Sequence, residues 1–133
     1  MKLPLSFYFQ DTVTVAQSLL GKKFVHVRNG KKISGLIVET EAYIGAKDLA
    51  SHARKGLRTP RNEALYLSGG HLYIFMIYGL HFCANVVTKD VGIPEAVLIR
   101  AIEPLEGIEF MKKRRKTKVL ENKDATRQVQ NHA

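Results

Sequence analysis

The sequence predicts an α+β fold, a single domain of residues 1–133 with a curved, mainly antiparallel β-sheet and short flanking helices. A length of 133 residues fits one domain with one hydrophobic core. Runs in which apolar, β-branched and aromatic residues alternate with polar ones are typical of strands. The dipeptide Asn29-Gly30 between the first two runs indicates a two-residue hairpin, which makes this first pair antiparallel.

The N-terminal part is expected to contain an irregular lead-in and one helix. Residues 1–10 show no clear period, and a helix is predicted over residues 13–20 with Asp11 or Thr12 as its cap. Gly21 is a suitable stop signal for this helix. Its buried face is expected to comprise Val13, Ala16 and Leu20.

The remaining elements follow from alternation and from glycine and proline positions. A turn or short helix is expected at residues 48–52, followed by a basic loop over residues 54–62. A helix is expected over residues 105–116. Strands are predicted at residues 23–27, 32–40, 71–78, 81–88 and 95–103, the last of them ended by Pro104.

The composition favours a basic intracellular protein with a polyanionic partner. The chain carries 21 Lys and Arg against 12 Asp and Glu, a net charge of +9, which favours nucleic acid before a membrane surface. No apolar run reaches the length of a membrane span, and the N-terminus lacks a signal-peptide pattern. The single cysteine, Cys83, excludes an internal disulfide and fits a reducing cytoplasm.

Several familiar site chemistries are absent from the sequence. No Cys/His cluster has zinc spacing, and Gly69-Gly70 lacks the pattern of a phosphate loop. Cys83 lies in an apolar run and is expected to pack rather than react. Carboxylates, aromatics, one arginine in an apolar strand, His52 and Asn85 remain on a basic protein. This set is typical of a metal-free hydrolase acting on nucleic acid.

The stretch from Gly35 to Gly45 organises the chain, because an apolar strand delivers two carboxylates at its end. The strand is expected to bury Ile37 and Val38. Strict alternation would place Glu39 and Glu41 on the inward face with Ile37, where ionised carboxylates are costly unless paired or functional. The alternative is a pair of carboxylates on a solvated rim.

Three further features have both a functional and a structural interpretation. Arg100 shares a strand face with aliphatic residues, Ile102 among them, and is expected to meet Glu41 or Glu39, either in a site or in a structural ion pair. Tyr78, at a strand end, is hard to assign to the core, whereas the strand aromatics before it are typical of core residues. The basic loop could contact phosphates or be a solvated mobile loop.

The chain resembles the alkyladenine (3-methyladenine, methylpurine) DNA glycosylases. The similarity lies in ordered segments across residues 16–115. They are LLGK at 19–22, GLIVETEAYIG at 35–45, D..ASH at 48–52, TPRN at 59–62, GHLYIF at 70–75, IYGLHFCAN at 77–85 and AVLIRAIEP at 96–104.

The resemblance implies a base-excision-repair enzyme that acts on double-stranded DNA containing damaged purines, without a cofactor, a metal or an obligatory protein partner. Such enzymes flip the base out of the duplex and hydrolyse its N-glycosidic bond with an activated water. Glu41 is then the general base, and Arg100 helps to hold it and the water. No lysine is placed as a Schiff-base nucleophile, so a monofunctional glycosylase is expected.

The same resemblance implies the DNA-contacting residues. Tyr43, His52 and Phe75 would sandwich the flipped base, with Phe75 where the family often has tyrosine, although His52 could instead be a structural histidine. Asn85 would lie at the pocket floor and disfavour guanine. Tyr78 would insert into the minor groove. The residues expected at phosphates are Arg54, Lys55, Arg58, Arg61 and those at 112–116.

Compared with the family, the chain lacks a C-terminal segment that carries a Gly-Pro motif and further strands. The expected consequences are an exposed sheet edge and a less complete water site. The alternative function is therefore a catalytically impaired DNA-binding remnant, and a basic RNA-binding β module is a third and weaker interpretation. The expected location is the cytoplasm, with nucleoid association if the source is bacterial.

Overall fold

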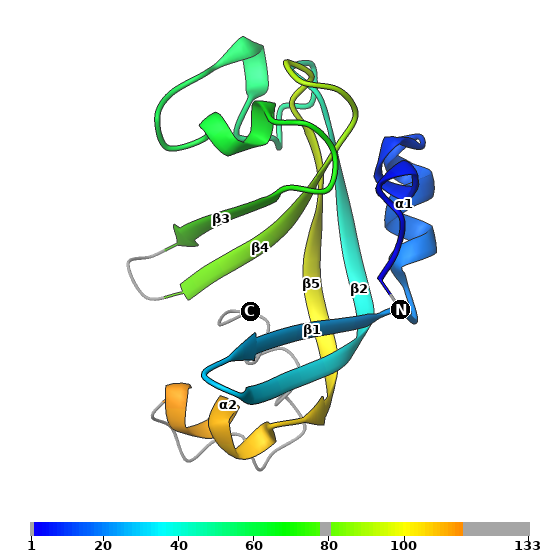
Figure 1. Ribbon diagram of the computed structural model, residues 1–133. Helices are drawn as coiled ribbons and strands as arrows, with labels where there is room; N and C mark the ends of the chain where they lie inside the picture. The colour runs from blue at the N-terminus through cyan, green and yellow to red at the C-terminus, as the bar shows by residue number, and fades with distance from the viewer. Residues whose placement is uncertain (1, 78–80, 116–133) are drawn as a thin grey trace.

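One curved antiparallel sheet with strand order β1-β2-β5-β4-β3 forms the centre of the computed structural model, which describes residues 2–77 and 81–115 (Figure 1). The expected α+β fold is confirmed. The strands are β1 (Lys23–Arg28), β2 (Lys31–Ile44), β3 (Leu72–Ile77), β4 (His81–Thr88) and β5 (Glu95–Glu106). The helices are η1 (Leu5–Phe9), α1 (Thr12–Leu19), η2 (Arg54–Gly56), η3 (Glu63–Tyr66) and α2 (Ile108–Arg115).

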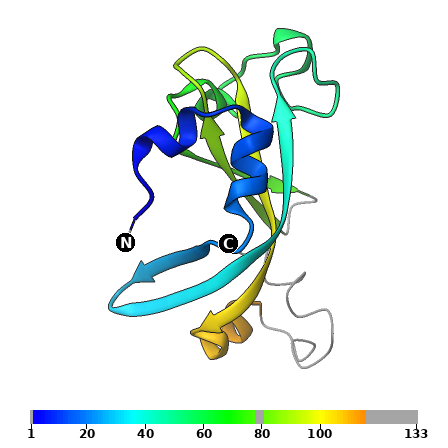
Figure 2. The ribbon, with the colours of Figure 1, turned by 90° about the vertical axis from the view of Figure 1, so that its right-hand side faces the viewer.

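The two long strands β2 and β5 form the backbone of the sheet and carry its irregularities. Ile37 lies opposite Ile102, but the next paired residue of β2 is Glu39, so Val38 has no partner in the ladder. Glu39 then pairs with Ala101 and Thr40 with Ile99, so Arg100 on β5 also has no partner in the ladder. Such β-bulges bend a strand and turn the following side chains to the other face. Both strands are curved, as the turned view in Figure 2 shows.

Helix α1 covers one face of the sheet with a different stripe from the expected one. Val15, Ala16 and Leu19 are buried, whereas Val13 and Leu20 are 39% and 45% exposed. The stripe is shifted because the polar Thr12 is also buried, and its hydroxyl lies 2.7 Å from that of Thr88 on β4. Asp11 caps the helix by accepting a hydrogen bond from the backbone N–H of Thr14.

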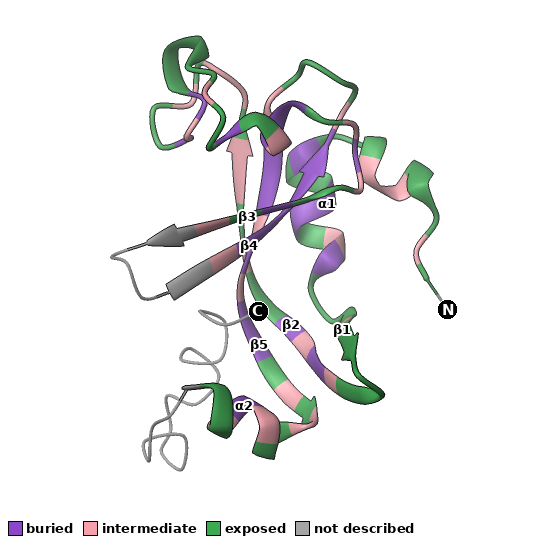
Figure 3. Ribbon diagram, turned by 60° about the vertical axis from the view of Figure 1, so that its left-hand side comes forward, coloured by how far each residue is buried: buried purple, intermediate pink, exposed green. Residues whose placement is uncertain are grey.

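Two apolar clusters form the core. The first joins α1 to residues of β2 and β5, including Ile37, Val97 and Ile102. The second lies under the segment between β2 and β3 and contains Leu65, Tyr73 and Ala96. Buried residues accordingly concentrate where β2, β4 and β5 meet α1 and this segment (Figure 3).

Several element boundaries differ from the sequence-based expectation, among them the end of β2, which continues to Ile44 beyond the expected residue 40. The N-terminal lead-in contains the 3₁₀ helix η1, and α2 begins only at Ile108. Strand β5 continues through Pro104, which faces Gly35 next to a register shift, where a missing N–H is tolerated. Gly35 is required there, because a Cβ atom would lie 2.8 Å from the carbonyl oxygen of Glu103.

Different elements lie at the two ends of the molecule. The β1–β2 hairpin and α2 lie at one end, and the segment between β2 and β3 lies at the other (Figure 2). In the described part of the chain, β1 and β3 are the edges of the sheet, and Val27 and Leu72 on them are exposed. Among residues 2–77 and 81–115, none of the helices has the length and apolar character needed to cross a membrane.

Candidate functional site

The second half of β2 presents Glu39, Glu41 and Tyr43 on the sheet face opposite to α1. The expectation that the two glutamates share the face of Ile37 is wrong, because the bulge at Val38 shifts the alternation by one residue. Ile37 packs in the α1 cluster, and Thr40 donates a hydrogen bond to the carbonyl of Ala16 in α1. Val38, expected to be buried, is 44% exposed.

Arg100 is placed between the two carboxylates. Its Nε atom lies 3.2 Å from Oε2 of Glu41 and 3.8 Å from Oε1 of Glu39, so the expected ion pair is present. Ile102, expected on the same face as Arg100, instead packs against Ile37, because Arg100 is itself the bulged residue of β5. The bulge thus turns a guanidinium from a buried strand toward the acidic face.

Tyr43 binds the same carboxylate from the other side. Its hydroxyl donates a 2.8 Å hydrogen bond to Oε1 of Glu41. Burial, together with this hydrogen bond and the charge of Glu41, raises the pKa of Tyr43 to about 12. The phenol therefore remains a protonated donor at neutral pH. Sequence reasoning assigned Tyr43 to stacking alone, although the spacing of two residues along a strand could have indicated this contact.

An open pocket adjoins this cluster, with about 280 Å³ of empty space that includes the solvent at its mouth. It brings together four of the predicted base-contacting residues. The predicted members are Tyr43, His52, Phe75 and Asn85, and those that sequence reasoning missed are Ser51, Leu65, Tyr73 and Ala96.

His52 and Phe75 form one side of this pocket together. Their ring centroids are 4.1 Å apart with the planes inclined by 59°. The His52 Nδ1 atom lies 2.8 Å from the hydroxyl of Tyr73. Burial lowers the pKa of His52, and the positive charges of Arg54 and Arg61 lower it further, so the imidazole is neutral at pH 7. His52 therefore has a structural hydrogen bond and a place on the pocket surface at once.

Asn85 is fixed at the pocket by the strand beside it. It lies opposite Tyr73 in the β3–β4 ladder and is 2% exposed. Its Nδ2 atom donates a 3.2 Å hydrogen bond to the carbonyl oxygen of Tyr73. A buried amide held in this way presents a fixed polar group to the pocket.

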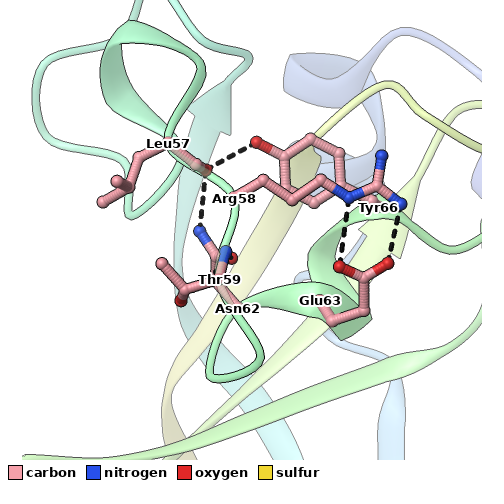
Figure 4. Close-up of polar contacts among 6 residues, drawn as sticks. All are labelled: Leu57, Arg58, Thr59, Asn62, Glu63 and Tyr66. Carbon is pink, nitrogen blue, oxygen red and sulfur yellow. Dashed lines mark hydrogen bonds and ion pairs between the residues drawn. The ribbon is translucent and has the colours of Figure 1, made fainter.

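The segment that carries His52 is organised by Asn62 (Figure 4). Asn62 is 4% exposed, and its Nδ2 atom donates to the carbonyl oxygens of His52 at 3.1 Å and Leu57 at 3.0 Å. Its Oδ1 atom accepts a 2.7 Å hydrogen bond from the N–H of Thr59. The Tyr66 hydroxyl donates to the same Leu57 carbonyl at 2.6 Å. One buried amide thus ties the basic loop to the backbone of the pocket histidine.

Arg58 has partners within this loop. Its guanidinium donates two hydrogen bonds to Glu63, at 3.0 and 2.6 Å, and lies 4.5 Å from the centroid of the Tyr66 ring (Figure 4). Arg54, Lys55 and Arg61 are exposed nearby. Phosphate contacts by these four cations stay a prediction.

Two further expectations concern the intercalating tyrosine with the last of the basic residues, and metal binding. Tyr78 and Lys116 lie outside the described residues. Within the described ranges, no group of three or more His, Cys, Asp or Glu side chains is arranged to hold a metal ion.

Comparison with known proteins assigns the family. The methylpurine-DNA glycosylase family model matches residues 6–130. A Clostridium acetobutylicum protein named "Putative 3-methyladenine DNA glycosylase" is 59% identical over 86% of this chain and 56% of its own length. A Bacillus cereus (strain AH187) protein of the same name is 53% identical over 84% of this chain and 55% of its own length. The chain spans about half the length of these relatives. The chain belongs to the methylpurine-DNA glycosylase family.

Proposed function

We propose that this protein hydrolyses the N-glycosidic bond of damaged purines in double-stranded DNA, with Glu41 as the general base. The observation that carries the proposal is the Glu41 carboxylate, held by Arg100 and Tyr43 beside an aromatic pocket. Family membership supports the same reaction class.

The carboxylate has two tasks in this reaction. It accepts a proton from the attacking water, and its negative charge stabilises the oxocarbenium character that develops on the deoxyribose as the purine departs. Arg100, which contacts Oε2, keeps the carboxylate in one orientation. No lysine is assigned a nucleophilic role, so the product is an abasic site in an intact strand.

The pocket is proposed to hold the flipped base by stacking. The rings of His52 and Phe75 contact each other and are proposed to form one wall, with Tyr43, which also lines the pocket, on the other side of the base. Alkylated purines are cationic or electron-poor, and aromatic faces attract such bases. Asn85 is proposed to disfavour the exocyclic amino group of guanine.

Extrusion of the base costs a few kcal/mol, and less for a damaged or mispaired base, which contributes to selectivity. Tyr78 is proposed to fill the gap that the base leaves in the stack. Phosphates are proposed to lie along the basic loop at Arg54, Lys55, Arg58 and Arg61. Of these residues, Arg58 also forms an ion pair with Glu63. Excess positive charge of this size makes duplex binding fall steeply with salt. We also propose a cytoplasmic location, with nucleoid association if the source is bacterial.

The test is excision from a labelled duplex with one hypoxanthine or ethenoadenine. We expect the protein to generate strand breaks that appear only after alkali treatment, because a monofunctional glycosylase leaves the sugar–phosphate backbone intact. Breaks without alkali would contradict the monofunctional mechanism. A duplex that is bound but never becomes alkali-sensitive would contradict the hydrolase and favour the DNA-binding remnant.

A further inference from the structure

We propose that Tyr43 is a positioning residue for Glu41, and that its phenol holds the carboxylate in the orientation needed for its work as a base. The inference rests on the proposed function and deepens it. It assigns Tyr43 a second task, separate from stacking its ring on a base.

The geometry gives each carboxylate oxygen of Glu41 one protein partner. The Tyr43 hydroxyl donates to Oε1 at 2.8 Å, and Arg100 Nε lies 3.2 Å from Oε2. A carboxylate has about four lone-pair positions, so each oxygen can still accept a hydrogen from a water molecule. The carboxylate is thus held from two sides and can still accept hydrogen bonds from water.

Strand geometry brings the side chains of Glu41 and Tyr43 together. Glu41 and Tyr43 are two residues apart in β2, so their side chains leave the same face of the sheet. Both lie beyond the bulge at Val38, in a regular ladder against β5 that runs from Thr40 to Ile44. A regular strand holds this pair more rigidly than a loop would.

The other charged and titratable groups near the pair do not replace the phenol. Arg100 on β5 contacts Oε2 of Glu41, and Glu39 on β2 shares the same guanidinium. Burial, and then the charge of Glu41, raises the pKa of the Cys83 thiol on β4, so the thiol is neutral. Asp48, after β2, adds to the negative charge around Tyr43. The Tyr43 hydroxyl therefore supplies the neutral donor that contacts Oε1.

The Tyr43→Phe variant tests the proposal, because it keeps the ring and removes the hydroxyl. We expect single-turnover excision at pH 7 to fall about tenfold, as for loss of one hydrogen bond to a charged group. The loss is expected in the rate of the chemical step at saturating enzyme, because the orientation of the carboxylate matters there. Binding of the lesion duplex should stay within about twofold, since the stacking surface is retained.

Tyr8→Phe is the matched control, because Tyr8 is a partly buried tyrosine of the N-terminal segment that packs against the α1 cluster. It should leave the excision rate and duplex binding unchanged. A Tyr43→Phe excision rate equal to that of the parent would overturn the proposal. So would a loss of duplex binding that accounts for the whole loss of rate, because stacking alone would then explain Tyr43.

Failure of the proposed function gives a different pattern. If the parent releases no base, or Glu41→Gln remains fully active, the glycosylase assignment to Glu41 is wrong. The contact between the two side chains is then decided by NMR titration of protein labelled with ¹³C at the tyrosine Cζ atoms. The proposal requires the pKa of Tyr43, about 12 in the parent, to fall in Glu41→Gln. Equal titration in both proteins would overturn it.

Discussion

Glu41→Gln is expected to slow purine excision by about three orders of magnitude, which lies within the range for loss of a general base. Glutamine preserves the size of the side chain and one hydrogen-bond acceptor, but it cannot take a proton from water or offset positive charge on the sugar. The measurement is the single-turnover excision rate on an ethenoadenine duplex, together with the affinity for the same duplex. The affinity should change little, because the pocket walls are unaltered.

Glu39→Gln is the matched control for this experiment. Glu39 lies on the same strand face and is also close to Arg100, at 3.8 Å, but it is Glu41 that accepts the hydrogen bond of the pocket residue Tyr43. We expect its excision rate to stay within about threefold of the parent rate, as for a partly exposed ion pair. If Glu39→Gln were the inactive variant and Glu41→Gln retained its activity, the assignment of the base would be wrong.

The second large effect is expected for stability. Asn62→Ala should lower the free energy of unfolding by about 2–4 kcal/mol, because it removes three hydrogen bonds to backbone groups and leaves partly buried backbone groups unpaired. The carbonyl of His52 and the N–H of Thr59 lose the partners that Asn62 supplies. Urea unfolding measures the effect, with a lower midpoint and an unchanged slope.

The Gln10→Ala variant is a control for this loss, because Gln10 donates one exposed hydrogen bond to the carbonyl of Phe7. Its free energy of unfolding should change by less than about 0.5 kcal/mol. An Asn62→Ala protein as stable as Gln10→Ala would show that the loop is not held by this amide. In that case the position of His52 would need another explanation.

Much of the fold could be predicted from local sequence signals. The Asn29-Gly30 turn and the alternation in residues 71–78 and 81–88 correspond to the β1–β2 hairpin and to strands β3 and β4. In β3, Tyr73 is buried and Leu72 and Ile74 are exposed, in agreement with the alternation. These features depend on residues close together in the chain, which is why the sequence predicts them.

The β-bulges could not be predicted in the same way. Val38 and Arg100 look like ordinary members of apolar strands, and their displacement from the ladder depends on pairing between β2 and β5, about 60 residues apart. The face of Glu41 was therefore assigned wrongly, although its partner Arg100 was identified. The buried face of α1 was predicted wrongly for a similar reason, since the hydroxyl of the buried Thr12 finds partners in Thr88 and Glu95, far away in the sequence.

The site was partly predictable. Tyr43, His52, Phe75 and Asn85 were identified by resemblance, and they line one pocket. Ser51, Leu65 and Tyr73 also line it, but nothing in their local pattern distinguishes them from core residues. Asn62 stands in a matched segment, yet its importance depends on three backbone groups that only the folded loop brings around it.

The most direct test of the central claim compares two abasic analogues in the same duplex, a neutral tetrahydrofuran and a cationic pyrrolidine. If the Glu41 carboxylate stabilises positive charge on the sugar, the parent should bind the pyrrolidine duplex at least about a hundredfold more tightly, as expected for a transition-state analogue. This preference should be lost in Glu41→Gln and kept in Glu39→Gln. Equal affinity of the parent for both duplexes, or a preference that survives in Glu41→Gln, would contradict the proposed role of Glu41.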